Sequence, residues 1–215
     1  AEECTELLEI LYGKSELEKT PATVSLINSL SPLGFSDEMA GSLITLARKG
    51  QACVIASLIM AGSSGPITLA GVLAQQTAEI LAGVTLAQFV RPGTPVIYGS
   101  TSAPMDMKSG GLSIGAPELS MIISFTAQLA RFYKLPSRSG GGLTDANYPD
   151  IQAGAESALA LSTAVRSGIS FILHSAGILG SYLAMSYEKY FADEEFAGKL
   201  LKLITPAEIS AEEID

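Results

Sequence analysis

Residues 129–150 read LARFYKLPSRSGGGLTDANYPD, and this stretch decides the fold class. A helical segment ends near Leu135, a short extended run follows at residues 136–139, and a glycine triplet begins at residue 140. The triplet opens a polar loop that carries Thr144, Asp145, Tyr148 and Asp150. An extended run followed by a glycine-rich turn and a helix is the repeating unit of a parallel α/β sheet.

The same unit recurs along the chain. Short β-branched or apolar runs occur at residues 23–27, 53–59, 95–98, 136–139 and 170–173. Their turns begin near Asn28, Met60, Tyr98, Ser137 and His174, at intervals of 32 to 39 residues. This spacing holds one strand and one crossover helix per unit, a pattern that open doubly wound sheets and closed barrels share.

The number of strand–helix units indicates whether the chain can form a closed barrel. At 215 residues the chain is expected to form one domain. A closed barrel has eight units and usually about 250 residues, so five units are too few. We therefore expect residues 1–208 to be part of a (β/α)8 TIM barrel from a longer protein, inactive alone and, if soluble, associated. Residues 209–215 are predicted to be an acidic tail or the start of a linker.

Composition excludes several classes of protein. The formal net charge of −9 disfavours binding to nucleic acid. Mean hydropathy is high, at +0.35, but glycine, serine and proline interrupt the longest uncharged runs, so no membrane-spanning helix is expected. Cys4 and Cys53 lack metal-ligand spacing, which predicts a reduced cytoplasmic protein without a metal site.

Common catalytic motifs are absent from the sequence. It contains no GxSxG, HExxH or P-loop motif, and no GxGxxG directly after a strand. The triplet Gly140, Gly141 and Gly142 suits either a phosphate cradle or a flexible turn. A phosphate-binding barrel of the aldolase type would also need a lysine at a strand end, and no lysine occupies one.

Two other features have alternative interpretations. His174 is the single histidine and falls at a strand end, where barrel active sites gather, which favours a functional role over that of a hydrogen-bonded core histidine. Ser175 follows it as the predicted cap of a helix that ends near Tyr190. Gly71 and Gly83, within a long helix predicted at residues 67–89, indicate close packing of helix on strand rather than ligand binding. The polar residues Gln75, Gln76 and Glu79 of that helix are expected to form a solvated or subunit-facing stripe.

Several motifs carry a resemblance to a known family. They read GPITLAGVLAQQTAEILAGVTLAQFVRPGTPVIYGS, MDMKSGGLSIGAPE, LARFYKLPSRSGGGLTDA, DIQAGAESAL and FILHSAGILGSYLAMSYEK, in that order. From about Pro66 to Glu195 the chain resembles the trimethylamine methyltransferase family. The resemblance implies an enzyme with a (β/α)8 barrel that moves a methyl group from a methylated amine to the cobalt of a separate corrinoid protein.

The resemblance also bears on the substrate. One branch of the family uses pyrrolysine, whereas this sequence shows only the ordinary twenty residues and is more similar to the branch that demethylates quaternary amines such as glycine betaine. Trimethylamine itself remains an alternative, as does a non-catalytic barrel that binds quaternary ammonium. No cofactor is expected to bind directly, since the partner protein carries the corrinoid, and a homo-oligomer is expected.

Site roles follow from the resemblance as hypotheses. Tyr98 and Tyr148 offer aromatic faces to a cation, and Asp106 supplies negative potential. The remaining assignments are catalytic for His174 and Asp145, substrate-binding for Arg138 and Thr144, and cofactor-binding for Gly140, Gly141, Gly142 and Ser100. Arg138 would pair with a substrate carboxylate, or alternatively form an internal salt bridge to Asp145 or Asp150. Asp145 alternatively serves as a helix N-cap or turn residue.

Overall fold

Five parallel strands form the main sheet of the computed structural model, which describes residues 1–17 and 19–206. They are β1 (Val24–Asn28), β2 (Ala52–Ser57), β4 (Val96–Ser100), β6 (Ser137–Gly140) and β7 (Phe171–Leu173). Their spatial order, β1-β2-β4-β6-β7, follows the chain order without reversal. An open doubly wound sheet reverses its strand order, so this order fits a segment of a barrel.

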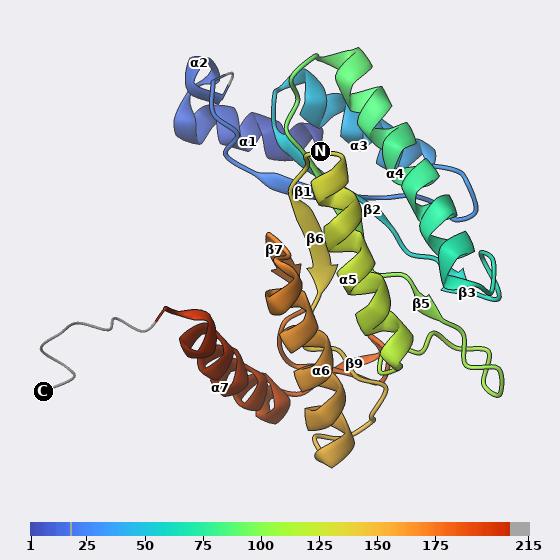
Figure 1. Cartoon of the computed structure of the whole chain (residues 1–215). Helices are drawn as coiled ribbons and strands as arrows, with labels where there is room; N and C mark the ends of the chain where they lie inside the picture. Colours follow the sequence, from blue (N-terminus) through green and yellow to red (C-terminus); the bar gives the residue numbers. More distant parts are fainter. Residues whose placement is uncertain (18, 207–215) are drawn as a thin grey trace, which may run out of the picture.

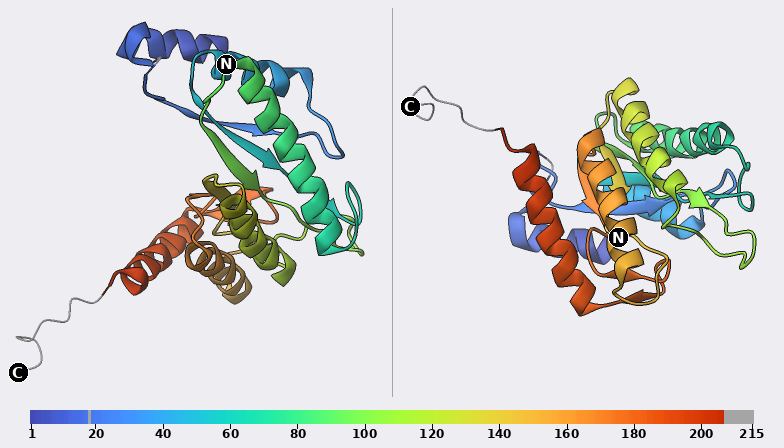
Figure 2. Two further views of the ribbon diagram at one scale, coloured as in Figure 1. Left: turned by 45° about the horizontal axis from the view of Figure 1, so that its top comes forward. Right: turned by 60° about the horizontal axis from the view of Figure 1, so that its bottom comes forward.

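The helices follow the strands. They are α1 (Glu2–Tyr12), α2 (Lys14–Leu17), α3 (Asp37–Arg48), α4 (Leu69–Val90), α5 (Pro117–Phe132), α6 (Ile151–Ser167) and α7 (Tyr187–Ile204). Figures 1 and 2 show α4, α5 and α6 standing side by side along one face of a curled sheet, with α7 beyond α6. The predicted partial barrel of about five units is therefore consistent with the structure, and the predicted tail at residues 209–215 lies outside the described residues.

Side chains alternate between the two faces of the sheet. Cys53, Ile55 and Tyr98 pack with buried residues of α3 and α4 on the helix-covered face. Gly99 and Arg138 are register partners on the opposite, concave face, next to Ala56. A Cβ atom on Gly99 would lie 2.9 Å from Cβ of Ala56, so the concave face is tightly packed there.

Two predicted helix starts are wrong. The helix predicted from residue 67 begins at Leu69, because the side chain of Thr68 accepts a hydrogen bond from the Gly71 amide as an N-cap. Ser175 does not cap the last helix. Residues 178–185 instead form an antiparallel hairpin of β8 (Ile178–Leu179) and β9 (Ala184–Met185), and Ser186 caps α7.

The predicted polar stripe on α4 is also wrong. Gln76 and Glu79 are buried, and the Glu79 carboxylate accepts hydrogen bonds from Ser29, Ser31, Ser57, Gln75 and the Leu33 amide. Gly83 does pack closely, as predicted, since a Cβ atom there would lie 2.6 Å from Cγ2 of Ile55. Among the described helices, α4 alone has the length and apolar composition to cross a membrane, yet core helices share those properties, and its polar residues Gln76 and Glu79 are buried within this fold.

Candidate functional site

Arg138 and His174 form the centre of the candidate site. Arg138 lies within β6, His174 directly follows the neighbouring strand β7, and Nη2 of Arg138 lies 3.3 Å from Nδ1 of His174. Arg138 is only 1% exposed, whereas His174 is exposed and stands between the guanidinium group and solvent. The site therefore has a buried cation behind an accessible imidazole at the carboxyl end of the sheet, where barrel enzymes place their chemistry.

The contact fixes the tautomer of His174. A guanidinium group only donates hydrogen bonds, so Nδ1 must accept, and the proton of the neutral ring lies on Nε2. Burial lowers the pKa of His174, and the charge of Arg138 lowers it further. Both effects favour a neutral imidazole.

Arg138 has no carboxylate partner among residues 1–17 and 19–206. The alternative salt bridges to Asp145 and Asp150 do not form, and Nε of Arg138 is buried without a hydrogen-bond partner. Burial lowers the pKa of the guanidinium group, as expected for an uncompensated buried charge. Such a charge is costly unless an anion pairs with it.

Tyr182 is a site residue that sequence reasoning did not single out. Its ring meets that of His174 edge to face, with centroids 5.1 Å apart, and its hydroxyl group is buried without a partner. Burial raises the pKa of Tyr182 to about 12. The residue lies in the β8–β9 turn with φ of 75°, and a predicted helix at this position concealed it.

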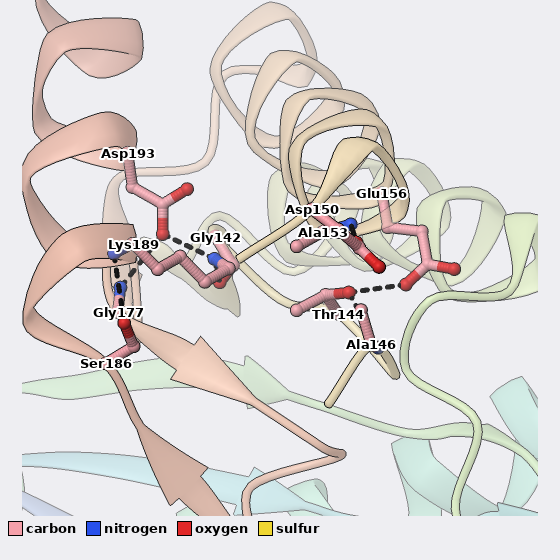
Figure 3. Close-up of polar contacts among 10 residues, drawn as sticks. All are labelled: Gly142, Thr144, Ala146, Asp150, Ala153, Glu156, Gly177, Ser186, Lys189 and Asp193. Atoms are coloured by element: carbon pink, nitrogen blue, oxygen red, sulfur yellow. Dashed lines mark hydrogen bonds and ion pairs between the residues drawn. The ribbon is translucent and has the colours of Figure 1, made fainter. Parts of the chain in front are cut away.

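Asp145 ties three loops together. Its carboxylate accepts hydrogen bonds from Ser113, Ser181 and the amides of Ile114 and Gly115. The predicted N-cap role belongs instead to Asp150, whose side chain accepts from the Ala153 amide at the start of α6 (Figure 3). These hydrogen bonds indicate that Asp145 holds the loops in place. Its catalytic role stays a prediction.

Thr144 is hydrogen-bonded to a side chain of α6. It is fully buried, and its hydroxyl donates to Oε2 of Glu156 at 2.6 Å (Figure 3). The same oxygen also accepts from the Asp145 amide. Glu156 therefore attaches the loop that carries Thr144 and Asp145 to α6. No sequence signal indicated this role. Thr144 is therefore held inside the described structure, and its substrate-binding role stays a prediction.

The glycine triplet is packed against protein. Cβ atoms on Gly140, Gly141 and Gly142 would lie 2.5, 2.6 and 2.3 Å from atoms of Leu143, Ile172 and Ser175. All three glycines are buried, so a side chain could not replace any of them without a shift of its neighbours, and their cofactor role stays a prediction. The carbonyl of Gly142 accepts from Nζ of Lys189, a buried lysine of α7 that also pairs with Asp193 (Figure 3).

Tyr98 and Ser100 are both buried in the described structure. Tyr98 lies on the helix side of the sheet, where its hydroxyl contacts Thr77 and its ring stacks on Tyr133. The hydroxyl of Ser100 donates a hydrogen bond to Oε1 of Gln76 in α4. The substrate role of Tyr98 and the cofactor role of Ser100 stay predictions.

Asp106 and Tyr148 remain on the surface. Asp106 accepts from the Lys108 amide and the Ser109 hydroxyl within its own turn, and the amide bond of Lys108 is the main cause of its lowered pKa. Tyr148 is 75% exposed. Neither contacts the pair of Arg138 and His174 in the described structure. Within the described residues no group of acidic, histidine or cysteine side chains is arranged to hold a metal ion.

Sequence comparisons identify the family. A family model described as trimethylamine methyltransferase (MTTB) matches residues 1–215. The chain belongs to the trimethylamine methyltransferase family. Its order of strands is compatible with part of the barrel that the family resemblance implies.

Three members of the trimethylamine methyltransferase family show the range of relatives. The chain is 57% identical over 202 residues to a glycine betaine methyltransferase of Desulfitobacterium hafniense, covering 94% of this chain and 42% of that protein. It is 41% identical over 190 residues to a proline betaine:corrinoid methyltransferase of Eubacterium limosum, covering 88% and 39%. It is 35% identical over 209 residues to a trimethylamine methyltransferase of Methanosarcina thermophila, covering 96% and 43%. The chain therefore spans about two fifths of the length of these relatives.

Proposed function

We propose that the protein containing this chain transfers a methyl group from a quaternary amine that bears a carboxylate, of the glycine betaine type, to Co(I) of a corrinoid protein. Family membership supports methyl transfer, and relatives at 57% and 41% identity are named for betaines. The observation that carries the substrate class is the buried guanidinium group of Arg138, which lacks an anionic partner among the described residues.

The substrate's carboxylate would complete the site. A carboxylate is a stronger acceptor than the imidazole nitrogen that now lies 3.3 Å from Nη2 of Arg138. It would pair with the guanidinium group and bring the quaternary nitrogen toward the mouth of the site, where the exposed His174 stands. Orientation of this kind is the main contribution of a protein to a displacement reaction.

The reaction needs no general acid. The electron pair of Co(I) forms the bond between cobalt and the methyl carbon while the bond between carbon and nitrogen breaks. The nitrogen keeps that second electron pair and leaves as a neutral tertiary amine, so no proton has to be supplied. A neutral His174 fits this chemistry, because an imidazolium ion would repel the quaternary substrate.

Two other functions are compatible with the family. One is transfer from trimethylamine, the substrate named for the relatives at 35% identity. The other is a non-catalytic barrel that binds quaternary ammonium. Arg138 favours a betaine over trimethylamine, since trimethylamine has no group to pair with a guanidinium ion. A phosphate-binding barrel of the aldolase type is not supported, because it would need a lysine at a strand end and no lysine occupies one in the described strands.

The localisation, the oligomeric state and the carrier of the cofactor are also proposals. We propose a cytoplasmic homo-oligomer that binds no cofactor directly and receives the corrinoid on its partner. Cys53 is buried and unpaired, as in a reduced compartment, and its pKa is raised to about 11 by burial. Binding of nucleic acid or membrane is not expected from a net charge of −9.

The oxidation state of cobalt distinguishes a methyltransferase from a non-catalytic binding protein. Full-length protein is mixed with glycine betaine and a corrinoid protein held as Co(I), and the visible spectrum is recorded over time. Conversion of Co(I) to methyl-Co(III), dependent on both the amine and the protein, is the expected result. Binding of glycine betaine without any methyl-cobalt would identify a non-catalytic binding module.

A further inference from the structure

Helix α7 carries an ion pair in the interior of the protein. Lys189 and Asp193 are bonded through Nζ and Oδ2, and their side chains are only 3% and 7% exposed. Lys199 and Glu195 form a second pair of the same spacing on α7, but those side chains are 68% and 71% exposed. Apolar side chains of similar volume often stabilise a fold as well as a buried ion pair does, because both charges lose their hydration. The buried pair, which we call the α7 ion pair, therefore indicates a role other than stability.

The α7 ion pair contacts two loops at once. Nζ of Lys189 donates to the Gly142 carbonyl at 3.1 Å, and Oδ2 of Asp193 accepts from the Gly177 amide at 2.9 Å (Figure 3). Gly142 lies two residues after the end of β6, and Gly177 lies four residues after the end of β7. The buried pair thus joins the loops that follow two neighbouring strands.

The two loops also contact each other. A Cβ atom on Gly142 would lie 2.3 Å from the carbonyl oxygen of Ser175, so the backbones meet there without space for a side chain. Gly177 has φ of 82°, a conformation that favours glycine. Its carbonyl accepts from the amide of Ser186, the N-cap of α7. Residues 175–177 are therefore held on both sides, by the loop after β6 and by the start of α7.

Both loops lead directly to the candidate site. Arg138 lies four residues before Gly142, and His174 lies three residues before Gly177. The pairing of β7 with β6 ends at Leu173, so His174 lies just beyond the sheet. The bonds at Gly177 constrain the chain on the other side of His174. The contact between Nη2 and Nδ1 is already 3.3 Å long, so a small shift of this segment would break it.

We propose that Lys189 and Asp193 are positioning residues, which hold His174 in contact with the guanidinium group of the site. They act through the two loops, by way of Gly142 and Gly177. This inference deepens the proposed function and rests on it, because the guanidinium group and the imidazole form the proposed site for the substrate's carboxylate. A misplacement of about 1 Å can lower the rate of a reaction by about 100-fold. The alternative is an anchor for α7 alone, which would change stability without moving His174.

Three double variants of the full-length protein separate the two roles. Lys189→Met with Asp193→Leu, the leucine variant, replaces the α7 ion pair with apolar side chains and removes both bonds to the loops. Lys189→Met with Asp193→Asn, the asparagine variant, also removes both charges, but it keeps an oxygen that can accept from the Gly177 amide. Glu195→Gln with Lys199→Met is the control, since it removes the exposed ion pair of the same helix.

Carbethoxylation reports the position of His174 without any substrate. Diethyl pyrocarbonate acylates an imidazole nitrogen whose lone pair is free. In the native contact the lone pair of Nδ1 accepts from Arg138, while Nε2 carries the proton. Loss of the contact should therefore speed the modification of His174, which is measured at neutral pH by mass spectrometry of its peptide. Alkylation of the buried Cys53 is followed in the same samples as a measure of general unfolding.

We expect His174 to react about fivefold faster in the leucine variant than in wild type, the ratio that corresponds to one hydrogen bond of about 1 kcal/mol. The asparagine variant should lie between the two, the control should match wild type, and Cys53 should stay protected throughout. Equal rates at His174 in the leucine variant and the control would overturn the proposal. So would faster modification of His174 and Cys53 together, because the α7 ion pair would then only stabilise the fold. If the leucine variant does not fold, Lys189→Met with Asp193→Ala replaces it and is judged in the same way.

A failure of the proposed function would be visible separately. The modification of His174 needs neither substrate nor corrinoid, so it decides the role of the α7 ion pair even if the wild-type protein transfers no methyl group. Where wild type is active, the KM for glycine betaine should also rise by about fivefold in the leucine variant. Faster modification of His174 with an unchanged KM would support the positioning role and count against the proposed binding of the carboxylate.

Discussion

Nη2 of Arg138 lies 3.3 Å from Nδ1 of His174, although the two residues are 36 positions apart in the chain. Parallel pairing of β6 with β7 explains this proximity, because it places successive strand ends next to each other. The longer than usual hydrogen bond leaves a buried guanidinium group poorly satisfied. A stronger acceptor would satisfy this guanidinium group better, and we propose that a substrate carboxylate is that acceptor.

Replacing Arg138 with Gln should separate binding of the carboxylate from methyl transfer. A hydrogen bond to a charged group contributes about 1.5–3 kcal/mol, so the KM for glycine betaine should rise by more than about tenfold. Transfer from choline, which lacks a carboxylate, should change little. Because an unpaired buried charge is removed, the melting temperature should stay the same or rise. Equal losses for both substrates in initial-rate assays would remove the role given to Arg138.

Replacing His174 with Ala should lower methyl transfer far more than stability. The side chain is exposed and makes one long hydrogen bond, so its loss should shift the melting temperature by only a few degrees at most. His174→Asn is the suitable control, because φ at this residue is 51° and Asn tolerates that conformation better than Ala. Thermal and catalytic losses that run in parallel across both variants would make His174 a structural residue.

Asp145→Ala should reduce stability and activity together. The change leaves the amides of Ile114 and Gly115 without their acceptor, at a cost of about 1–3 kcal/mol. Asp106→Ala serves as the control, because Asp106 is exposed and its hydrogen bonds stay within one turn. Chemical denaturation and initial rates measure both effects. A stable but inactive Asp145→Ala variant would instead support the catalytic role predicted from sequence.

Glu79→Gln should destabilise the protein in a pH-dependent manner. Burial raises the pKa of Glu79, but hydrogen bonds from Ser29, the Leu33 amide, Ser57 and Gln75 outweigh burial and leave the pKa below its usual value of 4.5. The ionised form therefore contributes stability above about pH 4.5, and that contribution is lost as the pH falls through the folded-state pKa.

We expect a loss of about 1.5–3 kcal/mol for Glu79→Gln at pH 7, because several hydrogen bonds to a buried carboxylate are weakened. The difference from wild type should narrow on acidification toward pH 4. Glu195→Gln, which alters an exposed pair with Lys199, is the control and should cost almost nothing. Urea denaturation at both pH values gives the comparison. A gap that is independent of pH would show that ionisation of Glu79 does not stabilise the fold.

The sequence predicted the strands and the parallel order well. Buried strands such as residues 53–59 are continuous apolar runs bounded by turn formers, a local signal that survives tertiary packing. The last connection was harder to predict. Residues 178–185 form a hairpin whose Ser181 and Tyr182 have positive φ, a conformation that neither residue type indicates. Ser181 is held there by hydrogen bonds that it donates to the Thr144 carbonyl and the Asp145 carboxylate.

Site residues were predictable only where strand ends defined them. His174 was singled out because it falls at a strand end, whereas Arg138, the second residue of β6, was assigned through the family resemblance and Tyr98 lies on the helix-covered face. A shift of one residue reverses the face of a strand residue, and the sequence alone does not say which face a barrel encloses. Glu79, Glu156 and Lys189 were missed because polar residues in helices normally face solvent, and only tertiary packing shows that these contact buried groups.

The most direct test of the central claim is a comparison of substrates. Full-length protein and its corrinoid partner, held as Co(I), are given glycine betaine, carnitine, choline and trimethylamine separately at equal concentration, and methyl-cobalt formation is followed spectroscopically. The account predicts the fastest transfer from glycine betaine or another amine with a carboxylate, slower transfer from choline, and little from trimethylamine. Transfer from trimethylamine alone would contradict it.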